Sequence, residues 1–88
     1  MLIRSQNKEV LVAFEFLLDI EVSGGVISTR RDIGWCCLLG EYSTKEKAMK
    51  VLDMIQKRYE EYETERIYKE GVFKIGTFQM PEDSEVEA

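Results

Sequence analysis

Arg30 and Arg31, which closely precede Trp35, form a basic–aromatic grouping. A guanidinium binds carboxylates and phosphates through a planar fork of donors, and an aromatic ring stacks on nucleobases. These three residues and Arg4 are therefore candidate ligand-binding residues for a small anionic molecule such as a nucleotide. The alternative is structural: two arginines in a turn, Trp35 in the core, and Arg4 on an edge strand beside a carboxylate.

The sequence offers little for catalysis. It contains no histidine, which excludes Ser–His and Cys–His nucleophilic pairs and histidine-ligated metal sites. The carboxylates between Glu41 and Glu65 are expected on solvent-facing positions, whereas carboxylate catalysis needs two groups in a cleft with separated pKa values. No Asp-x-Asp cluster or EF-hand loop is present. We therefore predict no catalytic residue, no metal and no cofactor, and expect a protein that is not an enzyme.

Cys36 and Cys37 are the two cysteines, and they are adjacent. Adjacent cysteines are poorly placed to form a disulfide with each other, and a strand directs them to opposite faces. A redox or metal-binding pair usually has two intervening residues. We expect one of them to be buried as a small apolar residue.

One helix is clearly indicated, from Ser43 to about Tyr62. Ser43 and Glu46 have the spacing of a capping box, in which each side chain accepts from the other residue's backbone N–H. Apolar residues then recur every three or four positions. The stripe consists of Ala48, Val51, Leu52, Ile55, Tyr59 and Tyr62.

The remaining segments alternate with the period of two that is typical of strands. We expect strands at Leu2–Ser5, Val10–Val22, Val26–Arg30, Trp35–Leu39 and Val72–Met80. Val10–Val22 exceeds the usual strand length, so a break is expected near Leu17 and Leu18. Ser23–Gly25 and Arg31–Gly34 are expected turns, and a bulge at Gly76–Thr77 would keep the last strand in phase.

The predicted fold class is α+β: an antiparallel sheet of about five strands, in the order β-β-β-β-α-β, packed on one main helix. A chain of 88 residues indicates one domain, which we place at 1–81. The acidic residues 82–88 follow Pro81, which ends strand pairing, and they are predicted to form a flexible tail.

The composition limits the partners. The net charge of −5 argues against direct nucleic-acid binding. No apolar run approaches the ~18 residues of a membrane span, and the N-terminus does not resemble a signal peptide. We expect a cytoplasmic protein.

Apolar residues lie on both faces of the predicted sheet. Leu11 and Leu17 alternate with the inward-facing positions, and Tyr59 and Tyr62 lie toward the end of the helix. One helix covers only one face of a sheet, and an uncovered apolar face usually marks an interface. These four residues are the predicted interface, and a homodimer or higher homo-oligomer is the predicted assembly.

Three blocks of the sequence resemble the small uncharacterised proteins encoded by phages, prophages and mobile elements of Gram-positive bacteria. They are Met1-x-Ile3-Arg4-Ser5-Gln6, then Leu39-Gly40-x-Tyr42-Ser43-x-x-Glu46-x-Ala48-x-x-Val51-Leu52-Asp53-x-Ile55, and Phe78-Gln79-Met80-Pro81. The resemblance covers less than half of the chain. It implies a phage-type genomic setting and no particular chemistry.

Two functions remain open. In the first, a non-enzymatic phage-type protein binds and interferes with a host protein, such as a defence or nucleic-acid-binding factor. The acidic helix end and tail would then imitate the charge of DNA. In the second, an oligomer binds a small anionic ligand through Arg4 or through Arg30 and Arg31. A pull-down from host lysate favours the first, and a ligand retained through purification favours the second.

Overall fold

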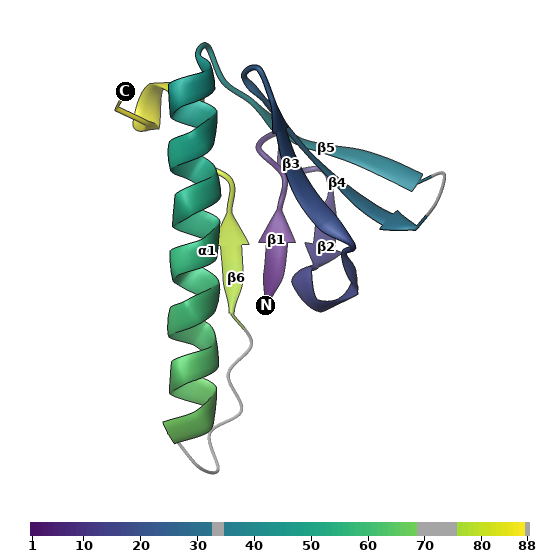
Figure 1. The fold of residues 1–88 in the computed structure, drawn as a ribbon, viewed down its shortest axis with the longest axis vertical. Coiled ribbons are helices and arrows are strands. Elements are labelled where there is room, and N and C mark those ends of the chain that lie inside the picture. The colour runs from purple at the N-terminus through teal and green to yellow at the C-terminus, as the bar shows by residue number, and fades with distance from the viewer. Residues whose placement is uncertain (33–34, 69–75, 88) are drawn as a thin grey trace.

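The structure, a computed structural model, describes residues 1–32, 35–68 and 76–87. Within these residues it is an α+β fold with one long helix and two three-stranded sheets (Figure 1). The strands are β1 Leu2–Arg4, β2 Leu11–Ala13, β3 Asp19–Ser23, β4 Val26–Asp32, β5 Trp35–Glu41 and β6 Thr77–Gln79. The helix α1 spans Lys45–Tyr68, and the short 3-10 turns are η1 Phe14–Phe16 and η2 Asp83–Glu85. The predicted fold class is confirmed.

The strands pair differently from the single antiparallel sheet that we predicted. The first sheet has the order β2-β1-β6, and β6 is parallel to β1. The second sheet is an antiparallel meander in the order β3-β4-β5. The parallel pair is possible because β2 to β5 and the long helix all lie between β1 and β6 in the sequence, and parallel neighbours require a long crossover of this kind.

The predicted turn at Ser23–Gly25 is confirmed as the hairpin that joins β3 to β4. Ser23 pairs with Val26, so Gly24 and Gly25 form a two-residue loop. Gly24 has a φ of 60°, which glycine adopts without a steric penalty. A Cβ on Gly25 would lie 2.0 Å from the carbonyl oxygen of Tyr42. This turn therefore requires glycine at both positions, for two different reasons.

The break in Val10–Val22 is confirmed, and it is wider than two residues. The chain leaves β2 at Ala13, makes the η1 turn and re-enters a strand at Asp19. The turn interrupts the alternation, which resumes in β3 with Ile20 and Val22 packed against the core. Phe16, predicted to face inward, is 74% exposed, whereas Leu17 packs against the core.

The helix begins one residue later than the proposed capping box requires. The backbone N–H of Lys47 donates to Thr44 Oγ1 at 3.2 Å, so Thr44 is the N-cap. The N–H of Ser43 instead donates to Asp83 Oδ1 at 2.7 Å. The prediction that Ser43 caps the helix is wrong because a distant carboxylate binds this residue. The helix also continues past Tyr62 to Tyr68.

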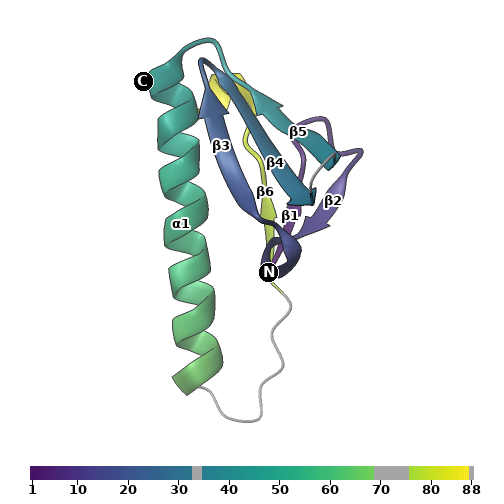
Figure 2. The same cartoon turned by 45° about the vertical axis from the view of Figure 1, so that its right-hand side comes forward.

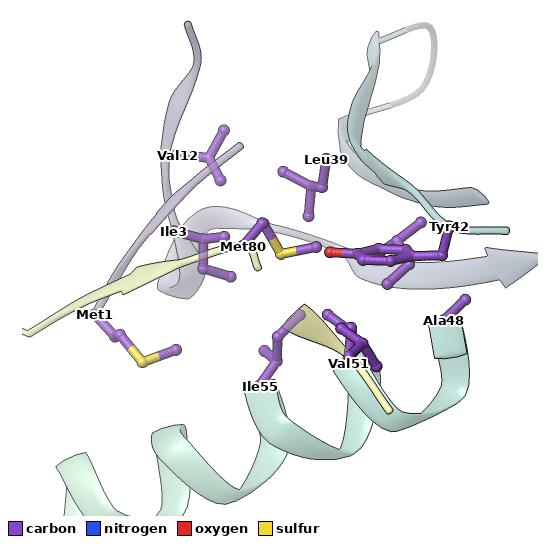
Figure 3. Packing of buried hydrophobic residues seen from close by; sticks show 11 residues of the cluster. Met1, Ile3, Val12, Leu39, Tyr42, Ala48, Val51, Ile55 and Met80 are labelled. Atoms are coloured by element: carbon purple, nitrogen blue, oxygen red, sulfur yellow. The ribbon is translucent and has the colours of Figure 1, made fainter. Parts of the chain in front are cut away.

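The core lies between the two sheets and α1, which runs beside β3 (Figure 2). Figure 3 shows Ile3 and Met80 from the first sheet region meeting Leu39 of β5 and Val51 and Ile55 of the helix. Each of these five residues is almost fully buried. The helix residues belong to the predicted apolar stripe.

Residues 82–87 pack against the rest of the fold, so the prediction of a flexible tail is wrong. Val86 is 6% exposed and belongs to the core. Asp83 binds the Ser43 N–H, and Lys47 Nζ donates to the Asp83 carbonyl oxygen at 3.2 Å. Tyr42 Oη donates to the Pro81 carbonyl at 2.8 Å, and burial, helped by Glu82 and other nearby carboxylates, raises the pKa of Tyr42 to about 12. The acidic composition of the segment did not indicate these contacts. They join residues that are far apart in the sequence, so local patterns could not predict them.

Two further predictions fall partly outside the described residues. The turn at Arg31–Gly34 includes two such positions, and Arg31 and Asp32 belong to β4. The proposed bulge at Gly76–Thr77 depends on Val72–Ile75, which are not described. The described part of that strand is β6, beyond which the Met80 N–H donates to the Arg4 carbonyl at 3.0 Å.

Candidate protein-contact surface

Arg30 and Arg31 direct their side chains to different faces of β4, as their partners show, and a register shift in the pairing with β5 lies between Arg30 and Asp32. Arg30 forms an ion pair with Asp19 and donates to Glu21 Oε1 at 3.2 Å. The hydrogen bonds and charge of Asp19 raise the pKa of Arg30, and Arg30 lowers that of Asp19. Two carboxylates therefore occupy this guanidinium, and it is poorly suited to bind a further anion.

Arg31 lies with Trp35 on the other face. Its guanidinium carbon is 4.8 Å from the centre of the indole ring, a cation–π contact. Among the described ion pairs, none involves Arg31. The two residues line a hollow of about 190 Å³ with Leu11, Phe16 and Leu17, which we call the sheet cleft. Two predicted ligand residues and two predicted interface residues thus meet at one place.

Arg4 does not join this cleft. It is exposed, its Nε donates to the Lys8 carbonyl oxygen at 3.0 Å, and it is absent from the residues that line the hollow. The predicted ligand site therefore divides into three places: Arg4 alone, Arg30 in an ion-pair cluster, and Arg31 with Trp35.

A second and larger hollow, of about 500 Å³, lies between α1 and the segment from Phe14 to Ile20. We call it the helix groove. Its apolar lining consists of Phe14, Leu17, Leu18, Ile20, Leu52, Ile55 and Tyr59. Asp19, Gln56 and Glu60 complete it, and Gln56 donates to Glu60 Oε1 at 3.2 Å. Leu18, Gln56 and Glu60 are exposed, so the groove opens to solvent.

The segment that separates the two hollows carries exposed apolar side chains (its η1 turn joins β2 to β3 in Figure 1). Phe16 is 74% exposed, Leu18 65% and the neighbouring Leu11 57%. Leu17 lines both hollows. We call Leu11, Phe16 and Leu18, with the two adjoining hollows, the docking surface. Single exposed apolar residues are common, but a continuous group beside concave apolar surface is typical of an interaction site.

The two predicted interface tyrosines are turned toward the fold. Tyr59 stacks on Phe14 with ring centroids 4.3 Å apart, and its centroid is 6.4 Å from that of Tyr62. A Cβ on Gly76 would lie 3.1 Å from the ring of Tyr62. Tyr59 therefore forms part of the groove wall, and Tyr62 packs beside it. Both are half-buried and contribute less free surface than we expected.

Sequence reasoning missed Phe16 and Leu18 as surface residues. The period-two pattern placed both on the inward face, and the η1 turn reversed their direction. The available signal was the run Phe16-Leu17-Leu18, in which three large apolar residues are consecutive and cannot all face one side of a strand.

The two cysteines differ in exposure, as the strand pattern predicts, but the expectation that one of them is buried is not met. Cys36 is exposed, Cys37 is half-buried, and both are free thiols. Burial, together with the neighbouring Cys36, raises the pKa of Cys37, which makes its thiolate scarcer at neutral pH.

Among the described residues, no group of three or more Cys, Asp or Glu side chains is close enough to hold a metal ion. In the same part of the chain, no helix has the length and apolarity to cross a membrane. The chain matches no protein-family model, no curated protein and no solved structure. The docking surface is therefore the feature on which a functional argument can be built.

Proposed function

We propose that this protein is a non-enzymatic binding protein that attaches to a host protein through the docking surface and interferes with it. The observation that carries the proposal is the exposure of Phe16 and Leu18 at the junction of two apolar hollows. A large aromatic side chain at the centre of an interface often supplies much of the binding free energy. The resemblance to phage and prophage proteins supports a bacterial host and a cytoplasmic location.

Imitation of DNA by the acidic helix end and the C-terminal segment finds no support in the geometry. Asp83 lies at the start of α1, beside Ser43 and Lys47, whereas Glu60 and Glu61 lie four turns further along the helix. A helix rises ~1.5 Å per residue, so ~20 Å separates the two groups of carboxylates. We therefore base the proposal on apolar contact.

The test is co-purification from a Gram-positive bacterial lysate with three versions of the protein. We expect wild type to retain a discrete protein partner, Phe16→Glu to lose it, and Leu38→Glu to keep it. Leu38 is a matched control because it is also exposed, at 52%, and lies on β5 outside both hollows. The partner is then purified and its dissociation constant measured. Equal binding by wild type and Phe16→Glu would contradict the proposal.

A second copy of the chain is the competing occupant of this surface, as in the homodimer that the sequence predicts. Met49 and Met54 on α1 are exposed at 41% and 43%. They are five residues apart and thus ~140° apart around the helix, so they do not form one contact face. Self-association would therefore use the docking surface. Sedimentation that shows a dimer for wild type and a monomer for Phe16→Glu would assign the surface to the homodimer.

A small anionic ligand in the sheet cleft is the second candidate function. The specific observation is the guanidinium of Arg31, which has a cation–π contact with Trp35 and no described ion pair. Native mass spectrometry of the purified protein tests it. A small molecule that stays bound to wild type and to Arg4→Gln, but is absent from Arg31→Gln, would support the ligand site.

A further inference from the structure

The helix groove has the dimensions of a site for a few large side chains. Its lining on α1 runs from Leu52 to Glu60, which is about two helical turns or ~12 Å. Ile55 forms part of the lining and is 1% exposed, whereas Leu18 at the rim is 65% exposed. A hollow of about 500 Å³ with this gradient of exposure can accept apolar groups from a partner without rearrangement of the core.

The charges around the groove have one sign. Its lining contains the carboxylates of Asp19 and Glu60 and no lysine or arginine. Arg30 pairs with Asp19 but also contacts Glu21, so these three side chains have a net charge of −1. Lys57 follows Gln56 on the same turn of α1 but does not line the groove. A partner that fills this apolar groove would gain from positive charges on both sides of its apolar residues.

We propose that the helix groove binds an amphipathic, basic helix of the partner protein. The inference rests on the proposed function and specifies the class of partner. Apolar residues at positions i, i+4 and i+7 of a helix extend over ~10.5 Å along one face, which matches the groove. Lysine or arginine residues beside that stripe would then face Asp19 on one side of the groove and Glu60 on the other side.

The test uses a fluorescein-labelled, 16-residue designed helix with a leucine stripe flanked by lysines. Two control peptides have the lysines replaced by glutamate or the same residues in scrambled order. Fluorescence anisotropy measures their binding to the whole protein at low and at physiological salt. We expect the basic amphipathic peptide to bind at micromolar concentration, with weaker binding at higher salt, and both controls to bind at least about tenfold more weakly.

Protein variants locate the binding. Leu18→Glu should weaken the binding of the basic peptide at least about tenfold, whereas Leu38→Glu should not change this binding. Glu60→Gln should weaken it about threefold and reduce its salt dependence, while Glu61→Gln, at the next residue and outside the groove lining, should leave it unchanged. Glu60→Gln alters an exposed side chain, so it keeps the test informative if Leu18→Glu fails to fold.

Each contrary result overturns the inference. These results are equal binding of the acidic peptide, wild-type binding by Leu18→Glu, and no binding of the basic peptide at all. The proposed function is tested separately through Phe16. If the Phe16→Glu variant fails to capture the host protein and the Leu18→Glu variant still captures it, the proposed function stands. The same result would show that the helix groove does not take part in binding the host protein.

Discussion

At the scale of single residues, Arg30 and Arg31 show how position decides the role of a side chain. Both are arginines on β4, and the sequence grouped them into one candidate site. Arg30 contacts Asp19 and Glu21, whereas Arg31, at the register shift between β4 and β5, contacts Trp35. The residue types could be predicted to bind anions. That the two arginines have separate partners could not be predicted, because the sequence pattern assigned Arg31 to a turn and not to the strand.

The N-cap of α1 provides a residue-scale prediction. Thr44→Ala should lower the free energy of unfolding by ~1 kcal/mol, since the Lys47 N–H loses its acceptor. Ser43→Ala should change it less, because Ser43 does not cap the helix and keeps its backbone N–H bond to Asp83, losing only the hydroxyl contact with that carboxylate. Urea unfolding of both variants measures the difference. A larger loss for Ser43→Ala than for Thr44→Ala would restore the capping box that the sequence suggested.

Asp83 provides a second residue-scale prediction, for acid pH. The hydrogen bond from the Ser43 N–H, aided by Lys47, lowers the pKa of Asp83 below its ordinary value of 3.8. A lowered pKa in the folded state adds stability above the ordinary pKa, and this stability is lost as the pH falls through the folded-state value. Wild type should therefore be more stable than Asp83→Asn at about pH 6, and the difference should disappear near about pH 2.

The measurement is the urea midpoint of the two proteins across that pH range. Glu15 and Asp19 also have lowered pKa values, so both proteins will lose stability in acid. Only the difference between them reports on Asp83. A difference that stays constant from about pH 6 to about pH 2 would mean that the carboxylate charge of Asp83 does not stabilise the fold.

At the scale of elements, the helices and turns that are specified by a local sequence pattern could be predicted. The helix follows from a stripe of period 3.6, and the β3–β4 hairpin follows from Gly24 and Gly25. The direction of β6 and the division into two sheets depend on which strands meet. Local patterns do not specify that choice. The docking surface was missed for a related reason, since the η1 turn interrupts the alternation between β2 and β3 and leaves Phe16 and Leu18 exposed.

The C-terminal segment provides the element-scale prediction. Removal of residues 81–88 should lower the free energy of unfolding by at least ~1–3 kcal/mol, because Val86 is buried in the core. Val86→Ala alone should account for a large part of the loss. Replacement of exposed Glu87 by Ala is the control and should have little effect. Thermal unfolding of the four proteins measures the losses, and an unchanged melting temperature after truncation would show that the segment is not attached in solution.

At the scale of the whole molecule, the three most exposed large apolar side chains of the described residues, Leu11, Phe16 and Leu18, lie on the segment from β2 to the start of β3. Buried side chains from both sheets and α1 share one core (Figure 3). The segment between β2 and β3 is left with Phe16 and Leu18 directed outward, next to two hollows. Exposure of such groups has a cost in water that binding would recover. We therefore propose, as the central claim, that the corner around η1 contacts another protein.

Site-specific photocross-linking in a bacterial host tests this claim most directly. The photoreactive amino acid p-benzoylphenylalanine replaces Phe16 in one protein and Leu38 in a control, and adducts are identified by mass spectrometry. The account predicts a discrete adduct with a host protein from position 16, absent from position 38. Either of two results would contradict it: the same adducts from both positions, or adducts from position 16 only with a second copy of the 10.3 kDa chain.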